Sequence, residues 1–304
     1  MNYTIAQESR IGGRQINQDR VAWLATDDAV LLVVADGMGG HLQGEVAAQI
    51  AIDTVIEGFR RAAKTRLADP PRFLGETLRQ AHEIIVRYAI DCRIPQHAAP
   101  RTTCIACVVQ DGQASWAHAG DSRLYLIYGQ PRGQSSVART RDHSIVQRMI
   151  DSGSISPEEA EHHPLRSRVF SCLGGDVTPH IEISPAVTLQ DGDLIALCTD
   201  GAWSPLGETL VAELGRAPLN TTVPHLLDAA EQAAGPGRDN LTLIALRWEG
   251  LAVDPSATSA TSAPADQSFC DTYIGQAPLS DKEIERAITE IRRRVPLIPT
   301  GNPS

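Results

Sequence analysis

Four aspartates stand at the ends of short apolar runs that are typical of β-strands. Asp36 and Asp200 each follow such a run directly. Asp239 precedes another run, and Asp121 lies between two of them. Turns at strand ends can project side chains into one cleft, and carboxylate oxygens are ligands that hard divalent cations prefer. A single Asp-Gly is more often a hairpin turn. The repeated pattern, without a Lys or Arg neighbour for every carboxylate, predicts a cation cluster.

Two such cations would favour hydrolysis of a phosphomonoester. Held about 3.5–4 Å apart, they neutralise the phosphoryl oxygens and supply a hydroxide at neutral pH. Asp36 leads into Gly37-Met38-Gly39-Gly40, a turn whose glycines allow backbone carbonyl oxygens to approach a cation closely. The carboxylates that such a reaction would need are therefore present in this chain.

Six short motifs follow one another along the chain, and an ordered set is more specific than any one of its members. They are Arg14-x-x-Asn17-Gln18-Asp19, Asp36-Gly37-Met38-Gly39-Gly40, Gly120-Asp121-Ser122-Arg123, Asp142-His143-Ser144, Thr199-Asp200-Gly201 and Gly237-Arg238-Asp239-Asn240-Leu241-Thr242. On these motifs, residues 3 to 248 resemble the metal-dependent protein phosphatase 2C (PPM) family in its compact bacterial form. The resemblance does not cover the rest of the chain.

The resemblance implies a fold and a reaction. The fold class would be α+β, a four-layer α-β-β-α sandwich of two antiparallel β-sheets flanked by helices. A water bridging two Mn²⁺ or Mg²⁺ ions would attack phosphorus. Arg14 would clamp the phosphate, because a guanidinium can donate two parallel charge-assisted hydrogen bonds. The catalytic residues implied in this way are Arg14, Asp36, Asp200 and Asp239.

The same resemblance assigns the metal-binding residues. Asp36 would bridge the two ions, and the Gly37 carbonyl would bind one of them. Asp19 would orient metal-bound waters from outside the ligand set. A third, weaker ion would use Asp121. The implied metal-binding residues in all are Asp36, Gly37, Asp200, Asp239, Asp19 and Asp121.

Three positions depart from the family pattern. Family members commonly have Glu where this chain has Gln18, and the lost charge is expected to lower affinity at the second metal. Met38 stands where many eukaryotic members have a histidine proposed as general acid, so solvent or another residue would protonate the leaving group. Ser204 replaces an acidic residue that would hold the third ion together with Asp121.

Apolar runs separated by tight turns predict a chiefly antiparallel β protein over a catalytic domain of residues 1–249. Strands are expected at 30–35, 102–109, 114–119, 123–128, 193–199 and 241–248. Helical spacing of apolar residues predicts the helices 44–63, 71–90, 144–152, 207–214 and 223–234.

Beyond residue 249 the composition changes. Small residues and proline dominate 251–267 and cannot bury enough area to offset chain entropy, so residues 250–279 are expected to form a flexible linker. Residues 280–304 form a tail in which Ser280 and Glu283 have the spacing of a capping box, which predicts a short helix. Two interpretations of that helix stay open, a docking peptide and a solvated helix at a disordered end.

The chain of 304 residues has a formal net charge of -10. That balance argues against duplex nucleic-acid binding, which needs clustered Lys and Arg. No run approaches the roughly 18 apolar residues of a membrane span. The polar segment 1–10 lacks the apolar core of a signal peptide. We therefore expect a cytoplasmic monomer with no nucleic-acid and no membrane partner.

The chain has 6 cysteines, of which Cys104 and Cys107 form a C-x-x-C inside a strand-like run. Residues three apart on a strand point to opposite faces. We therefore expect two buried, unpaired core cysteines and no cysteine metal site.

Four histidines could be taken for catalytic or metal-binding residues: His118, His143, His162 and His163. His118 is expected to belong to the core, and His143 to cap or pack at a strand–helix junction. The pair His162-His163 is not expected to bind metal. It lies within residues 150–175, a stretch that resembles the mobile flap beside the active site in the family.

The favoured interpretation is a protein serine/threonine phosphatase that reverses a Ser/Thr kinase in signal transduction, with phosphorylated proteins and that kinase as partners. One alternative is a non-catalytic, phosphoprotein-binding regulatory module on the same fold, supported only by Gln18 and Ser204. A second alternative is a metal-dependent hydrolase of small phosphoesters, because the chemistry at the metals is shared.

Overall fold

The computed structural model describes residues 1–38, 43–132 and 135–251. Gly39 and Gly40 of the predicted metal-binding turn lie outside the described residues, as do the predicted linker and tail from residue 252 onward. Within the described part of the chain, no helix combines the length and apolar character that crossing a membrane requires.

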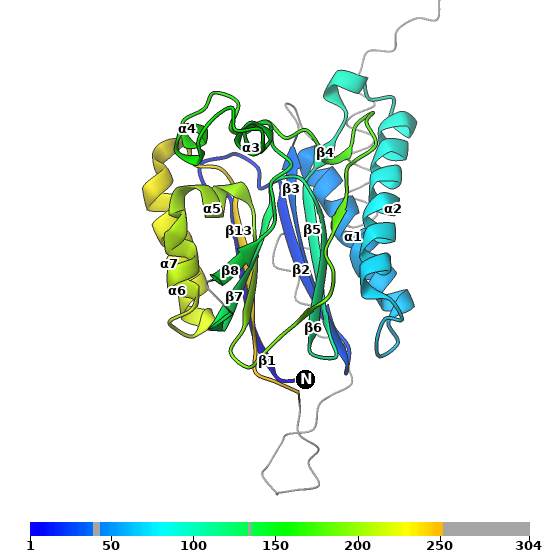
Figure 1. Ribbon diagram of the computed structural model, residues 1–304. Coiled ribbons are helices and arrows are strands. Elements are labelled where there is room, and N and C mark those ends of the chain that lie inside the picture. The colour runs from blue at the N-terminus through cyan, green and yellow to red at the C-terminus, as the bar shows by residue number, and fades with distance from the viewer. Residues whose placement is uncertain (39–42, 133–134, 252–304) are drawn as a thin grey trace, which may run out of the picture.

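Two antiparallel β-sheets form the middle of the molecule (Figure 1). The first sheet has the strand order β1 (Tyr3–Arg10), β13 (Leu241–Trp248), β12 (Leu194–Cys198), β7 (Arg123–Arg132) and β8 (Ser135–Arg139). The second has the order β10 (Glu182–Ile183), β6 (Gln113–Ala119), β5 (Cys104–Gln110), β3 (Ala29–Met38), β4 (Arg101–Thr102) and β9 (Leu173–Gly174). Beside these, β2 (Asp19–Ala25) pairs with β3, and β11 (Val187–Thr188) pairs with β6.

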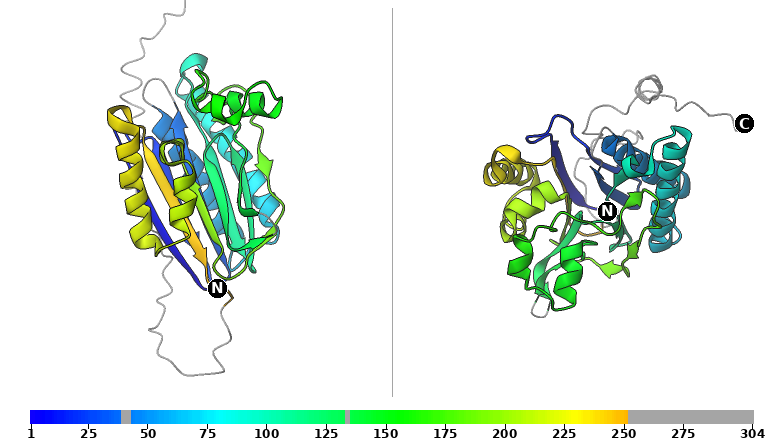
Figure 2. Two further views of the ribbon diagram at one scale, coloured as in Figure 1. Left: turned by 60° about the vertical axis from the view of Figure 1, so that its left-hand side comes forward. Right: turned by 90° about the horizontal axis from the view of Figure 1, so that it is seen from above.

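Helices cover both outer faces of the sheet pair (Figures 1 and 2). The second sheet is covered by α1 (Gly44–Ala62) and α2 (Pro70–Asp91), and the first by α5 (Asp200–Leu206), α6 (Glu208–Leu214) and α7 (Leu219–Ala234). The short helices α3 (Ile145–Asp151) and α4 (Pro157–Glu161) lie together at one end of the sandwich, at the top of Figure 1. Two 3₁₀ turns, η1 (Gln96–Ala98) and η2 (Gly235–Gly237), complete the described elements. The expected four-layer α+β sandwich is confirmed.

Strand β3 shows how the layers are held together. Its side chains alternate between the two faces of the sheet. Leu31 and Val33 belong to the cluster under α1 and α2, whereas Leu32 and Val34 belong to the cluster between the sheets. Because both faces are covered, the strand reads as one continuous apolar run. Each fully buried aliphatic side chain of this kind contributes about 1.5–3 kcal/mol to folding.

The two cysteines of the C-x-x-C obey the same alternation. Cys104 belongs to the cluster under the helices and Cys107 to the cluster between the sheets. Both are buried and free. The prediction of two unpaired core cysteines is confirmed.

The predicted elements differ from the observed ones in a few places. The strand expected at 102–109 is divided into β4 and β5 at Thr103, where the Asp36 N–H donates to the Thr103 side-chain Oγ1 at 3.1 Å and not to its backbone carbonyl. Strands β1 and β2 and helix α5 were not among the expected elements. The helix expected from residue 223 begins earlier, at Leu219.

Candidate metal centre

Two of the predicted aspartates face each other across neighbouring strands. Asp19 begins β2, Asp36 lies near the end of β3, and the antiparallel register places them directly opposite one another. Side chains in such a pair point to the same face and come close, so like charges repel. Burial first, and then the neighbouring carboxylates, raise the pKa of Asp36 well above its usual range.

Asp19 is held by two hydroxyl groups from the other sheet. Its Oδ2 accepts hydrogen bonds from Thr199 Oγ1 at 2.8 Å and Thr242 Oγ1 at 2.7 Å. Burial raises the pKa of Asp19 to about 7, although these two hydrogen bonds favour the charged form. Asp19 thus joins the start of β2 to the end of β12 and the start of β13.

Asp200 and Asp239 come from the facing sheet. Asp200 is the first residue of α5, just after β12, and Asp239 stands two residues before β13. A Cβ atom on Gly201 would lie 2.0 Å from the Asn240 carbonyl oxygen, so only glycine permits these two segments to approach so closely. Burial and the charge of Asp239 raise the pKa of Asp200 to about 6.

Gly37 occupies an equally close approach. A Cβ atom there would lie 2.2 Å from the Gly44 carbonyl oxygen and 2.7 Å from that of Gln18. The turn after β3 and the start of α1 therefore come together only because both residues are glycine. The carbonyl of Asp36, one residue earlier, is fixed by the Thr102 hydroxyl and the Thr103 N–H, each at 2.8 Å.

Arg14 lies at the exposed rim of this group. Its Nη2 donates to Asp239 Oδ2 at 2.6 Å, and the two side chains are 55% and 42% exposed. The hydrogen bond to Asp239 raises the pKa of Arg14, and the charges of Asp200 and Asp36 raise it further.

Asn240 positions the segment that carries Arg14. Its Nδ2 donates to the carbonyls of Ile11 and Ile16 at 2.8 and 3.0 Å, and its Oδ1 accepts the Gln18 N–H at 2.8 Å. Asn240 therefore does more than shape the turn beside Asp239. Its side chain holds both ends of the loop between β1 and β2.

Asp121 also lies close enough to take part in the group. Burial first, and then the charge of Asp200, raise its pKa well above the usual range. The Thr103 and Ser122 hydroxyls, 2.7 Å apart, connect this segment to Thr103, whose Oγ1 also accepts the Asp36 N–H at 3.1 Å. Ser204, one turn into α5, is exposed and offers no carboxylate for a third ion.

Arg123 has a supporting role beside Asp121. It forms a two-point ion pair with Asp142, with distances of 2.9 Å from Nε and 2.7 Å from Nη2. Its guanidinium lies 3.3 Å from the ring centre of Trp203 on α5. The indole N–H of Trp203 in turn donates to the Asp121 carbonyl at 3.0 Å. The Gly-Asp-Ser-Arg and Asp-His-Ser motifs therefore fix α5 against β7.

The five aspartates suit hard divalent cations. Their oxygens are the donors that Mg²⁺ and Mn²⁺ prefer. Burial and mutual repulsion raise the pKa of Asp19, Asp36, Asp121 and Asp200. A bound cation would relieve that repulsion, so the donor set fits the metal that the resemblance implies.

Several contributors to this centre were not predicted from the sequence. The hydroxyls of Thr199 and Thr242 support Asp19, and each stands inside a motif already noticed for its aspartate. Glu45 accepts a hydrogen bond from Gln18 Nε2 at 3.1 Å. A Glu at position 18 would instead face Glu45 with a second negative charge.

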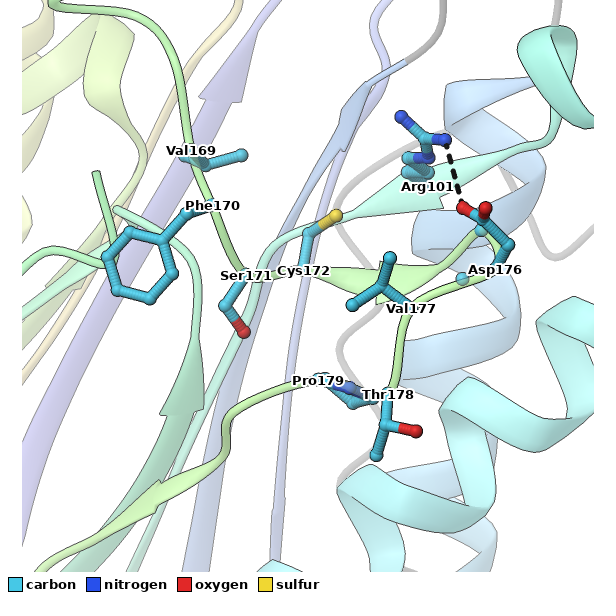
Figure 3. Close-up of a pocket in the computed structure, with 11 residues that line it drawn as sticks. Arg101, Val169, Phe170, Ser171, Cys172, Asp176, Val177, Thr178 and Pro179 are labelled. Atoms are coloured by element: carbon cyan, nitrogen blue, oxygen red, sulfur yellow. Dashed lines mark ion pairs between the residues drawn. The ribbon is translucent and has the colours of Figure 1, made fainter. Parts of the chain in front are cut away.

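A pocket of about 130 Å³ lies beside the aspartates rather than among them. It is formed by Arg101 and by residues 169–172 and 174–179 of the segment around β9 (Figure 3). Arg101 lies opposite Met38 in the β3–β4 pair and forms an ion pair with Asp176 at 3.8 Å. The pocket is therefore next to the strand that carries Asp36.

The sequence matches known phosphatases. A family model described as Protein phosphatase 2C matches residues 6–234. The serine/threonine protein phosphatase PstP of Mycobacterium tuberculosis is 31% identical, over 88% of this chain and 50% of that protein. The serine/threonine phosphatase stp of Listeria monocytogenes is 29% identical, over 72% of this chain and 84% of that protein. The chain thus spans half the length of the tuberculosis protein.

The fold matches solved structures as well. The catalytic domain of PstP, solved in complex with 2 manganese ions, has a TM-score of 0.65 and 29% identity. The match covers 81% of this chain and 97% of that chain.

Proposed function

Since the chain belongs to the protein phosphatase 2C family, we propose that it is a metal-dependent protein phosphatase acting on phosphoserine and phosphothreonine. The observation that carries this proposal is the convergence of aspartates from both sheets on one site with Arg14 at its rim. Relatives named serine/threonine phosphatases support the substrate class.

The metal ligands we propose are Asp36, the Gly37 carbonyl, Asp200 and Asp239, for two Mn²⁺ or Mg²⁺ ions. When bound, the ions would neutralise phosphoryl charge and supply an activated water as nucleophile. Asp19 orients waters from behind, because its carboxylate is already fixed by two hydroxyls. Asp121 lies ready for a third ion, which would bind weakly because Ser204 supplies no charge.

Arg14 is proposed to bind the phosphoryl oxygens. Its side chain is more than half exposed, so a substrate can reach it. The guanidinium has further N–H groups beyond the one that holds Asp239, and its planar fork matches two phosphoryl oxygens. The neighbouring Asn240 fixes the loop from which Arg14 extends.

Residues 150–175 are proposed to take part in substrate selection, as the resemblance to the family's flap implies. The pocket beside the aspartates supports this role, because part of its lining comes from this segment. A substrate side chain flanking the phosphorylated residue would reach Arg101 there, on the strand paired with β3.

The partners proposed are phosphorylated proteins and a cognate Ser/Thr kinase in signal transduction, with a cytoplasmic monomer as the working form. Support for a reducing compartment comes from the five described cysteines, all of which are free. Residues 1–249 are proposed as the catalytic domain, followed by the linker and tail.

The test compares substrates at a fixed Mn²⁺ concentration. We expect a higher kcat/KM on phosphothreonine and phosphoserine peptides than on small metabolite phosphates. A preference for the small phosphates would move the assignment to a small-phosphoester hydrolase. Tight peptide binding without phosphate release from folded protein would identify a regulatory module instead.

A further inference from the structure

A second group of ligand-type side chains lies outside the aspartate centre. His118 is on β6, Glu182 is its direct partner on β10, and His143 precedes α3. The two imidazole rings stack, with centres 4.5 Å apart and planes at 23°. One ligand atom from each of the three residues lies within 4.8 Å of the others. We propose that His118, His143 and Glu182 bind a zinc-class divalent cation, distinct from the ions of the aspartate centre.

The first support for this site is an unpaired nitrogen on His118. The ring is 1% exposed, and its Nε2 lies 2.9 Å from the Arg141 carbonyl oxygen. A carbonyl can only accept, so Nε2 carries the proton and Nδ1 keeps its lone pair. Within the described residues, Nδ1 has no hydrogen-bond partner. A ring that donates one N–H to a backbone carbonyl and turns its other nitrogen to a metal is the usual arrangement of a histidine ligand.

His143 supplies the second unpaired nitrogen. The ring is 3% exposed, and its Nε2 also lacks a hydrogen-bond partner in the described structure. That atom lies 3.6 Å from Glu182 Oε2. Leaving such buried polar atoms unpaired is costly, and a shared cation would satisfy both nitrogens together with the carboxylate.

Binding of a metal ion by these residues requires a proton shift on the His143 ring and a closer approach of the ligand atoms. Nδ1 of His143 lies 3.3 Å from the Gly120 backbone N, a long hydrogen bond. A metal on Nε2 moves the ring proton to Nδ1, so this contact is lost on binding. Zinc bonds of about 2.0 Å place tetrahedral ligand atoms about 3.3 Å apart, which is closer than the present limit of 4.8 Å. Glu182 Oε2 already lies 3.6 Å from His143 Nε2, and the 49% exposed Glu182 side chain gives the ion access from solvent.

The donor set selects the metal. Two imidazoles and one carboxylate form a common zinc site with one open position, whereas an all-oxygen set prefers Mg²⁺ or Mn²⁺. The two centres would therefore hold different metals in one molecule.

A zinc ion here would join three segments. It would connect β10 to β6 and to the segment just before α3. His143 already holds the flap itself, because its carbonyl accepts the N–H of Phe170, which lies within residues 150–175, at 2.8 Å. The His180 ring lies 4.9 Å from that of His143. Binding should raise the melting temperature, since the ion attaches only to the folded arrangement.

The test counts Zn²⁺ in the full chain dialysed in excess Mg²⁺, which occupies the aspartate centre. We expect one retained Zn²⁺ per chain and a zinc-dependent rise in melting temperature. Glu182→Gln should weaken zinc affinity by about tenfold or more and remove that rise. Glu208→Gln, which removes an exposed carboxylate on α6, is the matched control and should bind as the wild type does.

His118→Asn should lose the site as well, and its circular dichroism checks that the buried substitution leaves the fold intact. Glu182→Gln, at a partly exposed side chain, carries the test independently of that outcome. Absence of retained Zn²⁺ in the wild type would overturn the proposal. Zinc binding by Glu182→Gln equal to that of the wild type would overturn it too, because the ion would then lie elsewhere.

Discussion

Asp239 is partly exposed to solvent and is contacted directly by Arg14. Its side chain is 42% exposed, so replacing it with asparagine changes little packing. As a proposed metal ligand, however, its charge is needed. We expect Asp239→Asn to lower kcat/KM on a phosphothreonine peptide by about 100-fold or more while the melting temperature stays close to that of the wild type. Near-wild-type turnover by the folded variant would contradict its assignment as a ligand.

Gln18 is expected to stabilise the metal-free protein and to lower its affinity for metal, in comparison with Glu at the same position. Its amide donates to Glu45 at 3.1 Å. In Gln18→Glu two carboxylates face each other, which should destabilise the metal-free protein by about 1 kcal/mol or more. The added charge should tighten Mn²⁺ binding, measured by calorimetry.

The double variant Gln18→Glu, Glu45→Gln is the control for that experiment. It restores an amide opposite a carboxylate with the positions exchanged, so metal-free stability should return toward that of the wild type. Unchanged stability in the single variant would show that the two side chains do not interact in solution.

Helix α5 positions Asp200 through a contact that only glycine permits. A Cβ on Gly201 would lie 2.0 Å from the Asn240 carbonyl oxygen, so Gly201→Ala must push α5 away from the start of β13. We expect a loss of about 1–3 kcal/mol in unfolding free energy, measured by denaturant titration, together with reduced activity.

Gly215→Ala, at the C-terminal end of α6, is the matched control for Gly201→Ala. A Cβ there would find its nearest neighbours at 3.9 Å, an ordinary contact distance, and the backbone is already helical. Equal effects of the two substitutions would contradict the close-approach explanation of Gly201.

The elements that could be predicted are those with a strong period or a continuous apolar run. Helix α1 has a clear apolar stripe and was predicted to within one residue of its end, whereas β3, buried on both faces, was predicted only over its apolar run 30–35 and continues to Met38. Strand β1 escaped prediction because most of its residues are only partly buried and its apolar pattern is weak. Helix α5 escaped because it contains both Gly201 and Pro205, and its Asp-Gly start is typical of a turn.

The candidate site could be predicted as far as its carboxylates but not their supports. Aspartates at strand ends can be recognised in the sequence because the apolar run of the strand stops there. That Thr199 and Thr242 converge on Asp19 depends on how two sheets face each other, over separations of 180 and 223 residues. No local pattern carries that information.

The acidic centre lies between the two sheets. Asp19 links them, because its carboxylate on β2 accepts hydrogen bonds from Thr199 and Thr242 of the other sheet. Its folded pKa of about 7 lies above the value of about 3.9 expected in an unfolded chain. Between those values the folded state keeps a proton that the unfolded state has released. The contribution of Asp19 to stability therefore falls as pH rises through this window.

Comparison with Asp19→Asn measures that contribution together with the effect of Asp19 on the pKa of the neighbouring Asp36. In EDTA, we expect the stability of the wild type relative to the variant to fall by a few kcal/mol between about pH 4 and about pH 7. Saturating Mn²⁺ should largely remove the slope, since a cation replaces the proton. A difference independent of pH in EDTA would contradict the raised pKa.

Metal-dependent phosphate release is the central claim of this account. The most direct measurement follows release from a phosphothreonine peptide with Mn²⁺, with Mg²⁺ and with EDTA, for the wild type and for Asp36→Asn. We expect release with at least one of the metals, no release in EDTA, and almost none from the variant under any condition. Release that EDTA leaves unchanged, or no release with either metal from folded wild-type protein, would contradict the account.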